Sequence, residues 1–298
     1  EAQAAAHPRW LYRRLGEQWP QQRDDIIRAN NAQPPMTLRV NTHVTDRGAC
    51  LQALADAGIA AAPGGLSPWA ITLEEPRDVE RIPGFAAGQL SVQDEAAQLA
   101  APLLGPRPGE RILDACAAPG GKACHILELE PAVAELVAMD VSAERLQRVA
   151  ENLQRLSLDA TLLAGDAAAP PPGLAAQSFD RVLVDAPCSA SGVIRRHPDV
   201  KVLRQADDIA RLAYQQLAIL DGVWGLLRPG GRLLYVTCSV LEAENAAVVA
   251  RFLDAQPDAF ESPLDVDWGE RQPHGRQLLP AIAGTDGLFF CSLSRRVD

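Results

Sequence analysis

Residues 111–122 have the sequence Arg-Ile-Leu-Asp-Ala-Cys-Ala-Ala-Pro-Gly-Gly-Lys, in which a predicted strand is followed by a small-residue loop and a predicted helix. The apolar residues before Asp114 predict a short buried strand, and residues 122–130 predict a helix. The small residues between them let the backbone approach a ligand closely, and the helix N-terminus adds a partial positive charge. The order G-x-G-x-x-G is absent, so the dinucleotide-binding fingerprint is not met.

The same alternation of strand and helix continues toward the C-terminus. Strands are predicted over residues 136–140, 160–164, 179–185, 232–237 and 288–293. Helices are predicted over residues 94–104, 143–156, 207–227 and 242–256, and Pro229 to Gly231 predict a turn. Alternating elements of this length predict an α/β fold with a mostly parallel, doubly wound sheet.

Two smaller segments precede this sheet. Residues 8–35 predict one or two short helices. Residues 36–90 predict strands at 37–41 and 69–73 and helices at 47–57 and 76–82, an order typical of a small α+β module. We therefore divide the chain into a helical segment (1–35), a small α+β module (36–90) and a main domain (91–298).

The composition of the chain indicates the cellular environment and the kinds of partner that we expect for the protein. No apolar run approaches the roughly 18–20 residues of a membrane span, and residues 1–7 lack a signal-peptide profile. No cysteine pair has C-x-x-C spacing, so we expect no metal site and a reduced, cytoplasmic protein. The net charge of −10 argues against nucleic acid, but residues 195–204 carry four cations and one acid. That stretch could hold phosphates or form an ordinary solvated surface.

Acidic residues stand at the ends of four successive predicted strands, where α/β sheets bind their ligands. They are Asp114, Asp140, Asp166 and Asp185. Together with the small-residue loop they indicate a cofactor of nucleoside type, whose hydroxyl or amino groups the carboxylates would bind. The missing pyrophosphate fingerprint favours S-adenosylmethionine over NAD, and a nucleotide-dependent oxidoreductase remains the alternative.

Two thiols stand at the ends of neighbouring predicted strands, Cys188 and Cys238. A thiolate that adds to C6 of a pyrimidine makes C5 nucleophilic enough to attack a methyl sulfonium. A second group must then assist removal of the C5 proton. Asp185 could bind N3 or the exocyclic amine of the base. The alternative is that one or both cysteines are packing residues.

Three motifs resemble the signatures of RNA cytosine-5 methyltransferases: residues 114–122 (DACAAPGGK), 185–192 (DAPCSASG) and 237–245 (TCSVLEAEN). Residues 90–98 and 193–204 resemble the bacterial small-subunit ribosomal RNA branch of that family, the RsmB, Sun or Fmu type. The resemblance covers residues 8–298. It implies a Rossmann-like, S-adenosylmethionine-dependent methyltransferase sheet preceded by an RNA-recognition-like module, with 5-methylcytosine in small-subunit ribosomal RNA as product.

The resemblance also implies roles for individual residues. Cys238 would be the nucleophile and Cys188 would act in product release. Cofactor contacts would come from Cys116, Ala117, Ala118, Pro119, Gly120, Gly121, Lys122, Asp140, Asp166 and Asp185. RNA contacts are expected from Arg39, Arg195, Arg196, His197 and Lys201. The usual aromatic residue after the final Asp-Gly is replaced by Leu288, with no evident consequence.

The expected partner is ribosomal RNA, with no membrane and no metal, and we expect a monomer. Members of this branch usually begin with a helical RNA-binding domain, which we expect to be missing from this chain. Transfer RNA, another RNA or a protein remain alternative methyl acceptors. A non-catalytic RNA-binding factor that retains the fold is a further alternative, which the two intact thiols disfavour.

Overall fold

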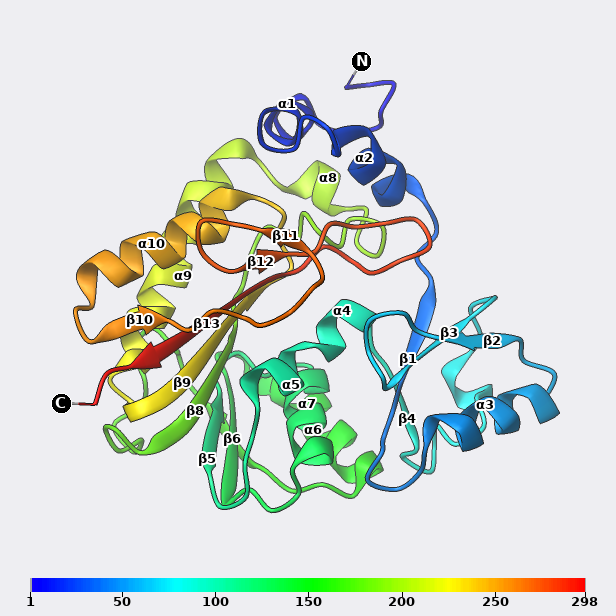
Figure 1. Cartoon of the computed structure of the whole chain (residues 1–298), viewed down its shortest axis with the longest axis horizontal. Coiled ribbons are helices and arrows are strands. Elements are labelled where there is room, and N and C mark those ends of the chain that lie inside the picture. The colour runs from blue at the N-terminus through cyan, green and yellow to red at the C-terminus, as the bar shows by residue number, and fades with distance from the viewer. Residues whose placement is uncertain (1, 298) are drawn as a thin grey trace.

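The computed structural model describes residues 2–297, and within them the largest element is a nine-stranded sheet (Figure 1). Its main path runs β11-β12-β13-β9-β8-β5-β6-β7, and β10 pairs with β13. The strands are β5 (Arg111–Asp114), β6 (Glu135–Asp140), β7 (Thr161–Ala164), β8 (Phe179–Asp185), β9 (Leu227–Thr237), β10 (Ala259–Glu261), β11 (Glu270–Arg271), β12 (Arg276–Gln277) and β13 (Phe289–Arg295).

The order of the parallel strands places the ligand-binding edge. β5 pairs in parallel with both β6 and β8, β6 pairs with β7, and β8 pairs with β9. The chain therefore runs outward from β5 in one direction and later in the other, and ligands of such sheets bind at this reversal point. Because these five strands are parallel, their carboxyl ends share one edge. This arrangement confirms the predicted doubly wound α/β fold.

Helices cover both faces of the sheet (Figure 1). They are α4 (Glu95–Gln98), α5 (Ala100–Leu104), α6 (Gly121–Leu129), α7 (Ala143–Leu156), α8 (Val200–Leu203), α9 (Ala206–Trp224) and α10 (Ala246–Ala255). Consecutive strand residues point to opposite faces. Val182 therefore packs in the core with residues of α9 and α10, whereas Leu183 packs in the core with residues of α5, α6 and α7.

A second, four-stranded sheet forms the small N-terminal module, at the right of Figure 1. Its order is β2-β3-β1-β4, from β1 (Met36–Val40), β2 (Ala61–Pro63), β3 (Ala70–Leu73) and β4 (Leu90–Val92), and α3 (Arg47–Asp56) packs on it. The preceding helices α1 (Arg9–Gln18) and α2 (Arg23–Asn31) instead share a core with Ile194, Val240 and Leu241 of the main domain.

Several predicted elements are wrong in detail. The helix predicted over 94–104 is divided at Leu99, because Pro102 cannot donate a hydrogen bond to the carbonyl of Gln98. The predicted helix over 76–82 is only a 3₁₀ turn, η1 (Val79–Arg81). The predicted turn at Pro229 to Gly231 lies inside β9, where the pairing with β8 shifts register between Phe179 and Arg181.

The helix predicted over 242–256 is also interrupted. It starts as a 3₁₀ turn, η2 (Glu242–Glu244), and α10 follows after Asn245, whose backbone is not helical. The Asn245 side chain accepts from Thr237 Oγ1 and donates to the Ser239 carbonyl, so tertiary contacts fix this residue. Among the described helices, none combines the length and apolar character needed to cross a bilayer.

Candidate active site

The loop between β5 and α6 is shaped by its glycine. Gly120 has φ +100°, and a Cβ there would lie 3.1 Å from Cγ1 and 3.2 Å from Cα of Val149. Only glycine therefore fits without strain or a shift of α7. α6 begins at Gly121 immediately after it, so the first backbone N–H groups of α6 are directed toward the carboxyl edge of the sheet.

A cavity of about 320 Å³ lies at this edge. Residues at or just after the carboxyl ends of β5, β6, β7, β8 and β9 line it together with one face of α9. They include Cys116, Ala118, Asp140, Asp166, Asp185, Cys188, Cys238, Gln215 and Ile219. The structure therefore brings together three of the predicted acids and both predicted catalytic thiols. Ala117, Pro119 and Gly120 belong to the loop, and Gly121 and Lys122 begin α6; none of the five is among the lining residues.

Asp140 and Asp166 differ in how many of their hydrogen-bond acceptor positions are already occupied by groups of the protein. Asp140 is 2 % exposed, and it accepts from the backbone nitrogens of Ala118 and Ser142 and from Arg145. Asp166 accepts from the nitrogen of Ala168, 2.9 Å away. A carboxylate has about four acceptor positions, so both acids keep capacity for a ligand's hydroxyl groups.

Asp114 is buried at the end of β5, where neither carboxylate oxygen makes a well-formed hydrogen bond within residues 2–297. Burial raises the pKa of this carboxyl to about 7, the negative charge of Asp185 adds to the shift, and Lys122 opposes it. A buried polar group without a partner is costly and is often completed by a ligand. The sequence pattern predicted an acid at the strand end, but it could not predict that the side chain would be buried without a well-formed hydrogen bond.

Lys122, in the first turn of α6, is bonded to Asp185, the last residue of β8. Its Nζ donates to Asp185 Oδ2 at 2.5 Å. Burial works against the charge on Lys122, but the attraction of Asp185 outweighs it, and the pKa of the ammonium group is raised. Asp185 lines the same cavity as the thiols, and the charge of Lys122 interacts with Cys238.

The two thiols are in contact. Cys188 Sγ and Cys238 Sγ are 3.2 Å apart, and both are free cysteines. The hydrogen bond with Cys238, together with burial, raises the pKa of the Cys188 thiol well above its usual range. Cys188 is therefore a neutral thiol near pH 7. Cys238 is the more exposed of the two and lies on the cavity wall.

The arginines expected to contact RNA are engaged within the protein. Arg39, 1 % exposed, makes two hydrogen bonds to Glu128 and others to Gln93 and the Gly121 carbonyl. Arg195 and Arg196 both pair with Asp286. Their contact with phosphate stays a prediction, and it would require these ion pairs to open.

His197 and Lys201 remain better placed for a contact with RNA. His197 is exposed, and Lys201 is partly exposed, with its Nζ directed to Asn31 Oδ1. Their contact with RNA also stays a prediction.

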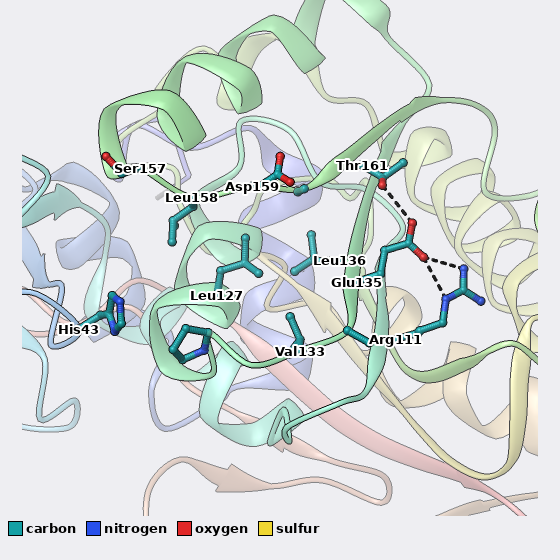
Figure 2. A pocket seen from close by; sticks show the side chains of 13 residues that line it. His43, Arg111, Leu127, Val133, Glu135, Leu136, Ser157, Leu158, Asp159 and Thr161 are labelled. Atoms are coloured by element: carbon teal, nitrogen blue, oxygen red, sulfur yellow. Dashed lines mark hydrogen bonds and ion pairs between the residues drawn. The ribbon is translucent and has the colours of Figure 1, made fainter.

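A larger cavity, of about 650 Å³, lies at the opposite edge of the sheet (Figure 2). Arg111 and Glu135, at the starts of β5 and β6, line it, and Glu135 accepts hydrogen bonds from both Arg111 and Thr161. It contains none of the predicted site residues. Because parallel sheets bind ligands at their carboxyl ends, the smaller cavity is the candidate active site.

Comparison with known proteins identifies the family. A family profile described as 16S rRNA methyltransferase RsmB/F matches residues 101–294, and one described as an RsmF/B-like ferredoxin-like domain matches residues 7–80. The chain is 54 % identical over 288 residues to ribosomal RNA small subunit methyltransferase B of Pseudomonas putida. It is 51 % identical over 293 residues to the protein of that name from Pseudomonas syringae pv. tomato.

Both alignments cover 97 % of this chain, which spans 66 % and 65 % of the length of the two relatives. A crystal structure of a methyltransferase homolog from Pyrococcus horikoshii matches with a TM-score of 0.83 and 26 % identity, over 99 % of this chain and 97 % of that one. The fold, the motifs and these similarities agree, and the chain belongs to the RsmB/F family of 16S rRNA methyltransferases.

Proposed function

We propose that this chain methylates C5 of a cytidine in small-subunit ribosomal RNA, with S-adenosyl-L-methionine as methyl donor. The observation that carries the proposal is the 3.2 Å contact between Cys188 and Cys238 in a cavity lined by carboxylates. The curated relatives are named ribosomal RNA small subunit methyltransferase B, which supports ribosomal RNA as the substrate.

The residues present fit such a donor. Bound there, S-adenosylmethionine would supply an electrophilic methyl group on a sulfonium. Asp140 and Asp166 offer acceptors for hydroxyl groups, and the loop from Cys116 to Lys122 offers backbone N–H groups at the start of α6. Asp185 adds an ionised carboxylate to the cavity wall, which suits a donor that carries a positive charge.

The protein's residues would act on the pyrimidine in two stages. The Cys238 thiolate would form a bond to C6, and the C5–C6 π electrons would then form the new C5–methyl bond while the bond from the methyl group to the donor sulfur breaks and leaves a neutral thioether. In the second stage the C5 proton is removed, the C5–C6 double bond re-forms, and Cys238 leaves as a thiolate. Asp185, held by Lys122, would accept a hydrogen bond from the exocyclic amine of the base and so orient the ring.

Cys188 would serve the second stage. Its raised pKa makes it a weak acid at rest and a strong base once ionised. As Cys238 leaves as a thiolate, it would take up the Cys188 proton while Cys188 accepts the proton from C5, so that both sulfurs end protonated. The 3.2 Å contact places this base beside the sulfur that has to depart.

Transfer of a labelled methyl group tests the proposal. The protein would be incubated with labelled S-adenosylmethionine and transcripts of small-subunit ribosomal RNA or tRNA, and the RNA digested to nucleosides. We expect the label in 5-methylcytidine from ribosomal RNA, and its loss in Cys238→Ala. Cys50→Ala, which removes a thiol of the small module, should retain the activity.

Label in another nucleoside would overturn the proposed chemistry. Preferential labelling of tRNA would instead overturn the proposed substrate.

A further inference from the structure

A single buried carboxylate connects the two cysteine loops. Glu244 is fully buried in η2, directly before α10. Its Oε1 accepts from the nitrogen of Ser189 at 2.7 Å, and its Oε2 accepts from Ser189 Oγ at 2.5 Å and from Ser239 Oγ at 2.6 Å. Ser189 directly follows Cys188 and Ser239 directly follows Cys238. One side chain thus bonds to the residue after each thiol.

We propose that Glu244 is a positioning residue for product release, which fixes the Cys188 loop against β9 and so sets the contact between the two thiols. The proposal rests on the proposed function, because it assigns Cys188 to the release step. Glu244 lies behind the thiols and is absent from the cavity lining, so it would act through Ser189 and Ser239.

The two loops depend on Glu244 to different degrees. On the Cys238 side, the carbonyl of Ser239 also accepts from Asn245 at 2.9 Å and from Gln277 at 3.2 Å, and Cys238 directly follows β9. On the Cys188 side, the Arg204 side chain makes long bonds of 3.3 and 3.4 Å to backbone carbonyls, and Gln216 donates to the Pro187 carbonyl at 2.9 Å. Gln216 also donates to Glu244 Oε1 at 3.2 Å, so this second support depends in part on Glu244. The loss of Glu244 should therefore displace Cys188 more than Cys238.

The backbone of the Cys188 loop is strained, which increases this dependence. Ala190 has φ +62°, in the left-handed region that non-glycine residues rarely adopt. Such a conformation persists only when surrounding contacts hold it. The bonds from Ser189 to Glu244, and the 3.0 Å contact of Ser191 Oγ with Ser239 Oγ, supply those contacts.

Kinetics of the covalent RNA adduct test the proposal. In Glu244→Ala, attack by Cys238 should continue, whereas adduct decay should slow about ten- to a hundredfold, as for a catalytic group misplaced by about 1 Å. The adduct should therefore accumulate during turnover, as in Cys188→Ala. Glu244→Gln should be intermediate, because its amide keeps an oxygen for the Ser189 nitrogen.

A control variant, Glu95→Ala, distinguishes a positioning effect of Glu244 on adduct release from a general loss of stability. Glu95 is another buried glutamate, and it accepts from the backbone nitrogens of Leu66 and Ser67 at 2.6 and 2.8 Å. Glu95→Ala should lower thermal stability without accumulation of adduct. If Glu244→Ala slows attack and release equally, as a general loss of folding would, the proposal is wrong. Should Glu244→Ala not fold, the ratio of attack to release in Glu244→Gln decides in the same way.

A second readout requires no RNA. Phenylarsine oxide condenses with two adjacent thiols to form a dithioarsenite and one water, and capture is scored by protection of Cys188 and Cys238 from alkylation. We expect capture in the unmodified chain and in Glu95→Ala, and weaker capture in Glu244→Ala. Unchanged capture in Glu244→Ala would overturn the positioning role. If no RNA is methylated at all, the proposed function fails, whereas the arsenical result still tests the role of Glu244.

Discussion

At the scale of single residues, the site depends on groups whose burial changes their chemistry. Asp114 and Cys188 both titrate away from their ordinary pKa, in each case toward the neutral form. The sequence could predict that acids and thiols gather at strand ends, because the strand pattern sets that edge. It could not predict burial or pairing. The ion pair of buried Arg195 with Asp286 is one such pairing, and a contact of Arg195 with phosphate stays a prediction.

The raised pKa of Asp114 predicts that the unfolding free energy of the ligand-free protein depends on pH. Its folded pKa of about 7 lies above the unfolded value of 3.8, so its stability contribution is complete below pH 4 and is lost as pH rises through 7. Relative to Asp114→Asn, the unmodified chain should lose up to roughly 4 kcal/mol of unfolding free energy across that window. Urea denaturation at several pH values measures this difference. A difference that does not vary with pH would contradict the assignment.

At the scale of elements, the periodic segments were predictable and the irregular ones were not. α7 and the strands β5, β6 and β8 follow from apolar spacing, because each buries a regular face. The short strands β10, β11 and β12 were missed, since two or three residues carry no period. β10 and β12 are placed by their pairing with β13, and β11 by its pairing with β12, rather than by their own sequences.

The turn into α6 is the element on which cofactor binding depends most. Gly120→Ala should destabilise the protein by about 1–3 kcal/mol, because alanine would be strained at φ +100° and would crowd Val149. Cofactor affinity should fall with it. Gly173→Ala is the control, since no atom lies within 4 Å of a Cβ there. Thermal melts measure the loss of stability, and calorimetric titration with S-adenosylmethionine measures the loss of affinity. Equal effects of Gly120→Ala and Gly173→Ala would contradict a specific role of Gly120.

At the scale of the whole molecule, a buried ion pair joins the small module to the main domain. Arg39 lies on β1, and its partner Glu128 lies on α6, with side chains 0 % and 2 % exposed. Arg39 also donates to the Gly121 carbonyl at 2.7 Å, so the same residue reaches the cofactor loop. The sequence predicted both parts, but it gave no indication of the contacts that fix one against the other.

Removal of one partner should show how strongly this pair holds the module. Arg39→Met should cost about 3–5 kcal/mol of unfolding free energy, because it leaves Glu128 buried and unpaired. Glu128→Leu in addition should recover part of that loss. A double-mutant cycle by denaturant unfolding measures both effects. Additive losses would show that the two side chains act independently.

The proposed mechanism is tested most simply by asking which cysteine forms the covalent RNA adduct and which one releases it. The proteins would be mixed with S-adenosylmethionine and a ribosomal RNA fragment, denatured, and analysed by gel for RNA covalently attached to protein. We predict a persistent adduct in Cys188→Ala and none in Cys238→Ala or in the double variant. Methylation by Cys238→Ala, or an adduct that survives its substitution, would contradict the mechanism.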